Sequence, residues 1–199
     1  MIGERGGEAC ALGVLGSLHQ AQCRLEEARP CFEQSLAIRR EIGDRLGEGL
    51  TLGNLGSLLG LLGLTDEAER SFERALAIHH EAAARRLEGI ALGGLARLRA
   101  CQGRRAEFLE AFAGGERLLR EVDDRIELGK LLASRGEADL AAGELAGARA
   151  ALTEATSLAA AIGVAPESAL GRSIDALRSA LGDSEPVPAT PAARPAKDA

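Results

Sequence analysis

Apolar and small residues recur along the chain with a period of 40 residues, and the register continues through four copies without an insertion or deletion. Each period holds two stretches in which apolar residues follow helical spacing and charged residues fill the opposite side. In the second copy these stretches are residues 47–63 and 66–82. The pattern predicts four similar helical hairpins. Three sets of positions keep the register: Leu12, Leu52, Leu92 and Leu132; Gly16, Gly56, Ala96 and Gly136; and Phe32, Phe72, Phe112 and Leu152.

A single hairpin of this kind cannot bury both of its apolar stripes, so neighbouring hairpins must stack and cover them. We therefore predict an all-α fold, an α-solenoid of four stacked helical hairpins with a C-terminal capping helix at 167–181. Pro166 suits the first helical position of that last helix. The array would cover residues 1–182, and the Pro- and Ala-rich residues 183–199 are expected to be disordered. The hairpin units are expected at about residues 8–45, 48–85, 88–125 and 128–165.

Small residues occupy the positions where the two helices of a hairpin would cross. Gly16 and Gly56 in the first helices, with Ala28 and Ala68 in the second, leave room for a close approach. Glycine inside a helix costs about 1 kcal/mol relative to alanine, and residues 47–63 contain several glycines besides Gly56. We therefore predict that these helices are stable only within the stack.

Composition and charge narrow the possible functions. Aromatic residues make up 2% of the chain, so the core must be built mainly from Leu, Ala and Ile, which suits closely packed helices. The net charge of −6 argues against a nucleic-acid or anionic-membrane partner, because both need a basic face. The cysteines show no metal-ligand spacing, and we expect free thiols in a reducing, cytoplasmic compartment. The most apolar stretch, residues 55–64, is too short to span a bilayer.

The sequence carries no signature of catalysis. It lacks the nucleophile elbow, the P-loop and the zinc-protease motif. Ser17 and His19 are two residues apart, so on a helix they face different directions and cannot form a nucleophile–base pair. His79 and His80 are adjacent and also diverge, and no Asp or Cys stands three or four residues from them. We therefore expect a non-catalytic protein that needs neither a metal nor a cofactor.

The pattern Leu52-Gly53-Asn54-Leu55-Gly56, followed by Ala68, Phe72 and Ala75, resembles the tetratricopeptide repeat. The 40-residue period resembles the longer variant of that repeat, which occurs in kinesin light chains, cell-polarity adaptors and many bacterial signalling proteins. The last unit and the helix after it resemble the C-terminal ends of large bacterial regulators. The resemblance implies that the first helices line a concave surface, which holds a peptide or helix of a protein partner.

Carried over by register, the resemblance implies a peptide-binding groove. Asn54 stands where the family often uses Asn to hold a peptide backbone, and its amide can both donate and accept hydrogen bonds. A solvated Asn on a helix face is an equally good interpretation. The groove would be formed by Leu50, Asn54, Ser57, Leu61, Ile90, Arg97 and Ser17.

Three functions stay open at this point. The first is an interaction scaffold in a bacterial signalling or regulatory system, binding a protein segment in its groove. The second is the small-molecule-sensing repeat region of a larger kinase or transcriptional regulator. The third is a purely structural array with no ligand of its own.

The first residues, MIGERGGEA, align with EIGDRLGEG at the joint between the first two units. We therefore interpret them as an inter-unit joint and expect the first helix to begin at about Glu8. That helix would expose Leu12, Leu15 and Leu18 on one side unless something covers them. We expect either further repeats before this face, or a partner on it, self-association included.

Overall fold

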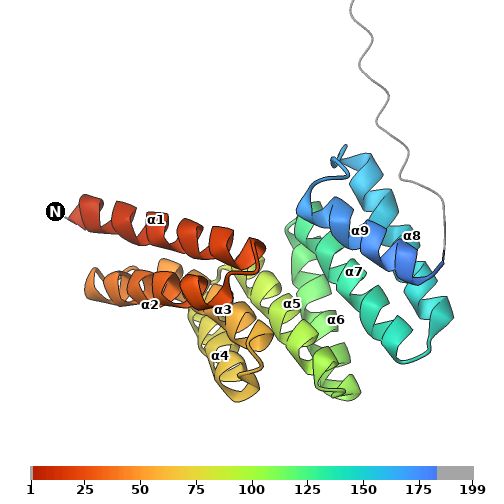
Figure 1. The fold of residues 1–199 in the computed structure, drawn as a ribbon, viewed down its shortest axis with the longest axis horizontal. Coiled ribbons are helices and arrows are strands. Elements are labelled where there is room, and N and C mark those ends of the chain that lie inside the picture. Colours follow the sequence, from red (N-terminus) through yellow and green to blue (C-terminus); the bar gives the residue numbers. More distant parts are fainter. Residues whose placement is uncertain (1, 183–199) are drawn as a thin grey trace, which may run out of the picture. The chain divides into compact units, whose positions relative to one another are not determined.

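The computed structural model describes residues 2–182, and within them every regular element is an α-helix (Figure 1). The predicted all-α helical-repeat fold is therefore confirmed. None of the described helices combines the length and the hydrophobicity needed to cross a membrane. The residues 183–199, which we expected to be disordered, lie outside the described part. The helices are α1 (Ile2–Ala21), α2 (Leu25–Glu41), α3 (Arg45–Leu61), α4 (Thr65–Glu81), α5 (Arg85–Cys101), α6 (Arg105–Glu121), α7 (Arg125–Ala141), α8 (Leu145–Ala161) and α9 (Ala169–Ala180).

The chain forms two compact units, residues 1–123 and residues 124–199. In the first unit the hairpins α1–α2, α3–α4 and α5–α6 stack because α2 also packs against α3, and α4 also packs against α5. In the second unit α7 and α8 form a fourth hairpin, and α9 lies against both of them.

Helix α9 covers an apolar face of its unit, as a capping helix would. Leu170, Ile174 and Leu177 are each at most 1% exposed. The helix begins at Ala169, because the Ser168 hydroxyl accepts a hydrogen bond from the Gly171 N–H at 3.0 Å and so caps it there. The expectation that Pro166 occupies the first helical position is therefore wrong.

The tight turns between helices recur every 20 residues and use a left-handed backbone conformation. Glycine occupies most of these positions, with φ of +71° at Gly43 and +76° at Gly63. Cys23, Ala83 and Asp123 take the same conformation, with φ of 58°, 51° and 51°. The turn is thus imposed by the stacking of helices even where the residue does not favour it.

The glycines at the helix crossings are needed for contact with phenylalanine. A Cβ added to Gly16 would lie 2.8 Å from the Phe32 ring, and one added to Gly56 would lie 3.1 Å from the Phe72 ring. Both phenylalanines are at most 2% exposed. The prediction that small residues permit a close crossing is confirmed.

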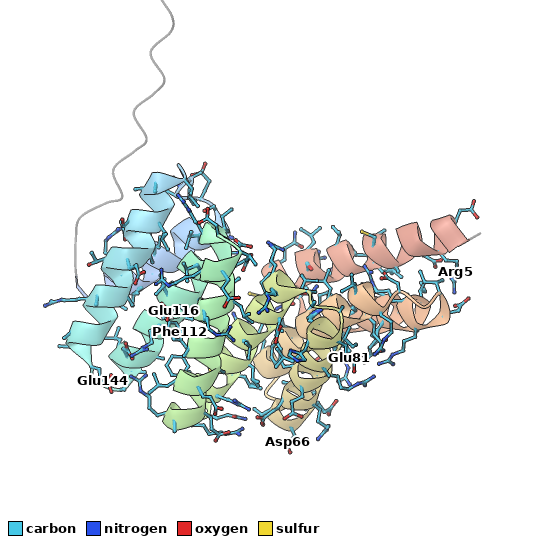
Figure 2. The ribbon with its side chains drawn as sticks, turned by 180° about the vertical axis from the view of Figure 1, so that it is seen from behind. Arg5, Asp66, Glu81, Phe112, Glu116 and Glu144 are labelled. Carbon is cyan, nitrogen blue, oxygen red and sulfur yellow. The ribbon has the colours of Figure 1, made fainter. Side chains whose placement is uncertain are left out.

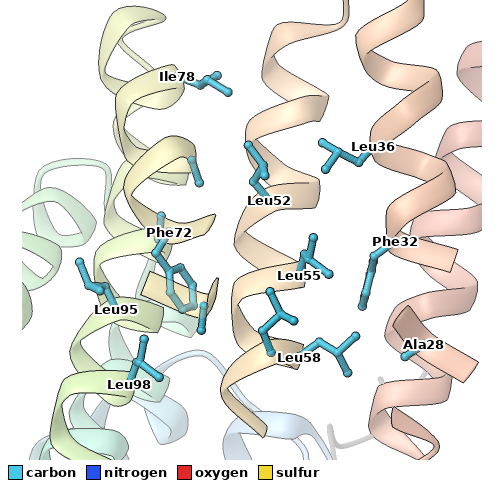
Figure 3. Close-up of a cluster of buried hydrophobic side chains, with 14 residues drawn as sticks. Ala28, Phe32, Leu36, Leu52, Leu55, Leu58, Phe72, Ile78, Leu95 and Leu98 are labelled. Atoms are coloured by element: carbon cyan, nitrogen blue, oxygen red, sulfur yellow. The ribbon is translucent and has the colours of Figure 1, made fainter. Parts of the chain in front are cut away.

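The core of the first unit continues from one hairpin into the next. In the close-up of Figure 3, Leu36 and Phe32 of α2 face the leucines of α3, and Phe72 of α4 lies beside Leu95 of α5. Charged residues such as Asp66 and Glu81 lie on the outside (Figure 2). Apolar burial between hairpins is therefore the main force that stacks them.

A buried and a half-buried carboxylate add polar links between consecutive hairpins. Glu48 is 5% exposed and accepts hydrogen bonds from Arg40 at 2.9 Å and Arg45 at 2.8 Å. These guanidinium groups outweigh the effect of burial and hold the pKa of Glu48 below its usual range. Glu69 of α4 is paired in the same way with Arg99 and Arg104, which lower its pKa.

The structure corrects the start of the first helix. Helix α1 begins at Ile2 rather than at about Glu8, so residues 2–7 are helical and do not form a turn. Gly43 has a φ of +71°, whereas the aligned Gly3 lies within the helix. Arg5 supports the helical form by pairing with Glu8, three residues along, and with Glu41 of α2.

Candidate binding groove

Two adjoining hollows lie between α3 and α5 in the first unit, and both reach down to Phe72 of α4. Ser57 lines both hollows, so they form one groove along the two helices. The first hollow has a volume of about 60 Å³. The second, toward the C-terminal ends of the helices, has a volume of about 180 Å³.

Six of the seven residues expected at the groove line these hollows. Those in the first hollow are Leu50, Asn54, Ser57 and Ile90. Those in the second hollow are Ser57, Leu61 and Arg97. These six residues therefore lie beside the groove. Their role in binding a peptide stays a prediction.

Ser17 is the seventh expected residue, and it lies apart from this groove. It is exposed on α1, and its hydroxyl donates a hydrogen bond to the Gly13 carbonyl of the same helix at 3.0 Å. The repeat register placed it beside Ser57, but neither hollow includes α1 among its lining residues.

The depth of the groove comes from glycines that bring helix backbones against large side chains. A Cβ added to Gly49 would lie 2.6 Å from the His79 ring, and one added to Gly94 would lie 2.4 Å from the Phe72 ring. Gly53 differs, because a Cβ added there would meet no atom within 4 Å. The Gly53 backbone is therefore open to a ligand that lies along the groove.

His79 is a groove residue that the sequence reasoning missed. It comes from α4, lines the first hollow and is 2% exposed, and its Nδ1 atom has no hydrogen-bond partner among the described residues. Burial lowers its pKa, and the nearby Glu88 carboxylate and the Gly49 backbone oppose that shift only in part. His79 is therefore neutral at neutral pH.

A signal for His79 was present in the repeat register. The aligned residues in the other second helices are Arg39, Leu119 and Ala159, so a histidine occurs at this position in one copy only. Adjacency to His80 suggests only a metal-ligand role for His79, which the divergent directions of the two side chains argue against. Helix α4 packs against α3 and α5, and this packing buries His79 and leaves His80 exposed.

The groove offers apolar contact together with a few polar groups. Leu50, Ile90 and Leu98 supply apolar walls, and Asn54 supplies an amide. Arg97 is exposed at the second hollow, and no carboxylate is present among the described residues that line either hollow. Among the described residues no group of three His, Cys, Asp or Glu side chains is arranged to hold a metal ion. The arrangement suits binding of a segment with apolar side chains and a polar backbone.

The fold is that of a helical-repeat protein with a groove between two of its first helices, α3 and α5. Residues 7–81 match the model of the tetratricopeptide repeat family. No curated protein matches the sequence. Residues 7–81 therefore carry tetratricopeptide repeats.

Solved structures with the same fold extend the likeness beyond residues 7–81. BtubC (BKLC) from P. vanneervenii is 15% identical, with a TM-score of 0.69, over 90% of this chain and 75% of that one. A putative kinesin light chain from P. anserina with nearly identical repeats is 16% identical, with a TM-score of 0.62, over 90% of this chain and 89% of that one. At these identities the likeness shows the fold alone. Tetratricopeptide repeats generally act as non-catalytic scaffolds for protein–protein interaction.

Proposed function

We propose that this protein is an interaction scaffold that binds a segment of a partner protein along the α3–α5 groove. The observation that carries the proposal is the groove itself, which runs past the open backbone of Gly53. A ligand backbone can approach α3 closely there because no side chain intervenes.

The lining favours an extended or helical segment with at least one aliphatic side chain. Leu61 is 57% exposed and Leu50 is 41% exposed, so both leave apolar surface in contact with water that a ligand would cover. Asn54 can donate to and accept from a main chain, and Arg97 can pair with a carbonyl or carboxylate.

The size of the hollows argues against the small-molecule-sensing alternative in this part of the chain. Pockets for drug-sized ligands typically have volumes of roughly 300–1,000 Å³ and enclose most of the ligand. The larger hollow has about 180 Å³. It is better suited to single side chains of a longer segment than to a whole metabolite.

The test is to fill the groove without disturbing the fold. In the variant Gly53→Gln the new side chain enters open space, and glutamine favours a helix more than glycine does, so stability should be kept or raised. The control is Ala77→Gln, which adds the same side chain to an exposed position of α4 away from the groove.

Peptides selected on the wild-type protein from a random displayed library provide the probe. We expect Gly53→Gln to weaken their binding at least about tenfold, measured by titration calorimetry, and Ala77→Gln to leave it unchanged. That loss corresponds to about 1.4 kcal/mol. Equal binding by the wild type and Gly53→Gln, both folded by circular dichroism, would overturn the groove assignment. The bacterial signalling context and the cytoplasmic location stay predictions.

A further inference from the structure

The first hollow of the groove has a polar group in its floor without a partner in the protein itself. His79 of α4 lines this hollow and is 2% exposed. The Gly49 backbone lies near the ring, but no hydrogen bond joins a described residue to the buried Nδ1 atom. A buried ring nitrogen without a partner raises the free energy of the folded protein, and a group that pairs with the ring recovers that loss. His79 therefore favours a ligand that brings a hydrogen-bonding group into the hollow.

The volume of the first hollow limits what can enter it. The hollow measures about 60 Å³, against about 180 Å³ for the second. A single water molecule needs roughly 10–15 Å³ of such a cavity, so there is room for a side chain of a few non-hydrogen atoms. Aromatic side chains and the long cationic side chains of lysine and arginine are too large. A small side chain with a hydrogen-bonding group fits both the volume and His79.

The surroundings of His79 argue for a neutral hydroxyl in the hollow. The described residues that line it include no Lys or Arg to pair with a carboxylate, and the nearby Glu88 charge would repel one. Burial lowers the pKa of His79, so its ring is neutral at pH 7.5. A neutral imidazole donates with one ring nitrogen and accepts with the other. A hydroxyl can pair with either nitrogen, because it both donates and accepts.

Apolar side chains complete the hollow around His79. These side chains are Leu50 of α3, Phe72 of α4, and Leu87 and Ile90 of α5. A methyl group beside the hydroxyl would contact them and be removed from water. Threonine carries both groups on one carbon atom, so it suits the hollow better than serine. Valine has nearly the same shape but leaves His79 without a partner.

We propose that the first hollow takes a threonine, or less strongly a serine, of the bound partner segment, and that His79 determines this specificity. The hydroxyl of that residue hydrogen-bonds to the His79 imidazole, and its methyl group contacts Leu87 and Ile90. The backbone of the segment lies along α3 beside Gly53, where no side chain intervenes. This specificity rests on the proposed function, because it needs a protein segment in the groove.

The test compares peptides that differ only in this hydroxyl. Peptides are selected from a random displayed library on the wild-type protein at pH 7.5, and those whose binding Gly53→Gln weakens are kept. We expect them to share a threonine or serine at one position. Replacing a threonine there by valine, or a serine by alanine, should weaken binding to the wild type at least about tenfold, measured by titration calorimetry.

Two variants show whether His79 is the partner of the hydroxyl. His79→Leu removes the imidazole, and leucine fits this register since Leu119 is buried in α6. His80→Leu makes the same change at the next residue, which is exposed and lines neither hollow. We expect loss of the peptide hydroxyl to weaken binding to His79→Leu less than about twofold, and binding to His80→Leu as much as to the wild type.

The outcomes separate this specificity from the proposed function. Peptides that Gly53→Gln weakens but that share no threonine or serine overturn the specificity and leave the groove assignment intact, and this result needs no variant of His79. An equal loss in the wild type and His79→Leu also overturns it, because the hydroxyl would then pair with Asn54, Ser57 or a trapped water. If Gly53→Gln weakens no selected peptide, the proposed function fails, and this specificity fails with it.

Discussion

At the scale of single residues, Ala83 occupies a turn position with a φ of 51°, where most of the other turns use glycine. A left-handed conformation costs a residue with a Cβ roughly 1–2 kcal/mol, and glycine avoids that cost. We predict that Ala83→Gly stabilises the protein by about 0.5–1 kcal/mol in urea denaturation, since the gain is reduced by the added freedom of the unfolded chain. The reverse change, Gly63→Ala, should destabilise it, because φ is +76° there. Destabilisation by Ala83→Gly would contradict this account.

His79 leads to a prediction about pH. Its pKa lies below the unfolded value of about 6.5 because burial disfavours the charged ring. The unfolded state therefore binds a proton more readily, and stability that is fully present above pH 6.5 declines as the pH falls below it. The carboxyls of Glu48 and Glu69, whose pKa values are also lowered, begin to lose their contribution only below about pH 4.5.

The variant His79→Leu separates these contributions. Leucine fits this register, since Leu119 in α6 is 1% exposed. We expect the unfolding free energy of the wild type to fall between pH 7.5 and pH 5.5, and that of His79→Leu to fall less, by urea denaturation at each pH. The exposed His80 is left in place in both proteins. An equal fall in the two proteins would show that the pKa of His79 is the same in the folded and unfolded states.

At the scale of helices, α1 and α3 have the same pattern but different surroundings. Leu58 is 0% exposed and Leu18 is 50% exposed at the same register. We predict that Leu58→Ala destabilises the protein by about 2–5 kcal/mol, through lost burial and the cavity left behind. Leu18→Ala should cost less than about 0.5 kcal/mol. Urea denaturation of the two variants measures both values, and similar losses would mean that α1 is covered in solution.

The existence of the helices was largely predictable, because the 40-residue repeat shows the same helical spacing in every copy. The residues at which the helices begin were less predictable. The start of α1 was wrong by several residues because the turn at Gly43 depends on two helices packing around it. Helix α9 begins at Ala169 rather than at Pro166, because the hydroxyl of Ser168 caps the first N–H groups and outweighs a favourable proline position.

At the scale of the whole molecule, six of the seven residues that the repeat register placed at the groove line the hollows between α3 and α5. Ser17 on α1 lines neither hollow. The register also missed His79, which comes from a second helix and lines the first hollow beside Gly49. Gly49 permits that approach with its backbone close to the His79 ring.

The sequence by itself determined that the protein is a stack of helical hairpins, since the period, the small residues at the crossings and the apolar stripes are local patterns that repeat. Only the tertiary structure decided which copies of a pattern are covered. The register makes Leu15, Leu55 and Leu95 equivalent, yet a neighbouring hairpin buries two of them and leaves the third exposed. The physical reason is that burial belongs to a pair of surfaces, and a residue pattern describes only one of them.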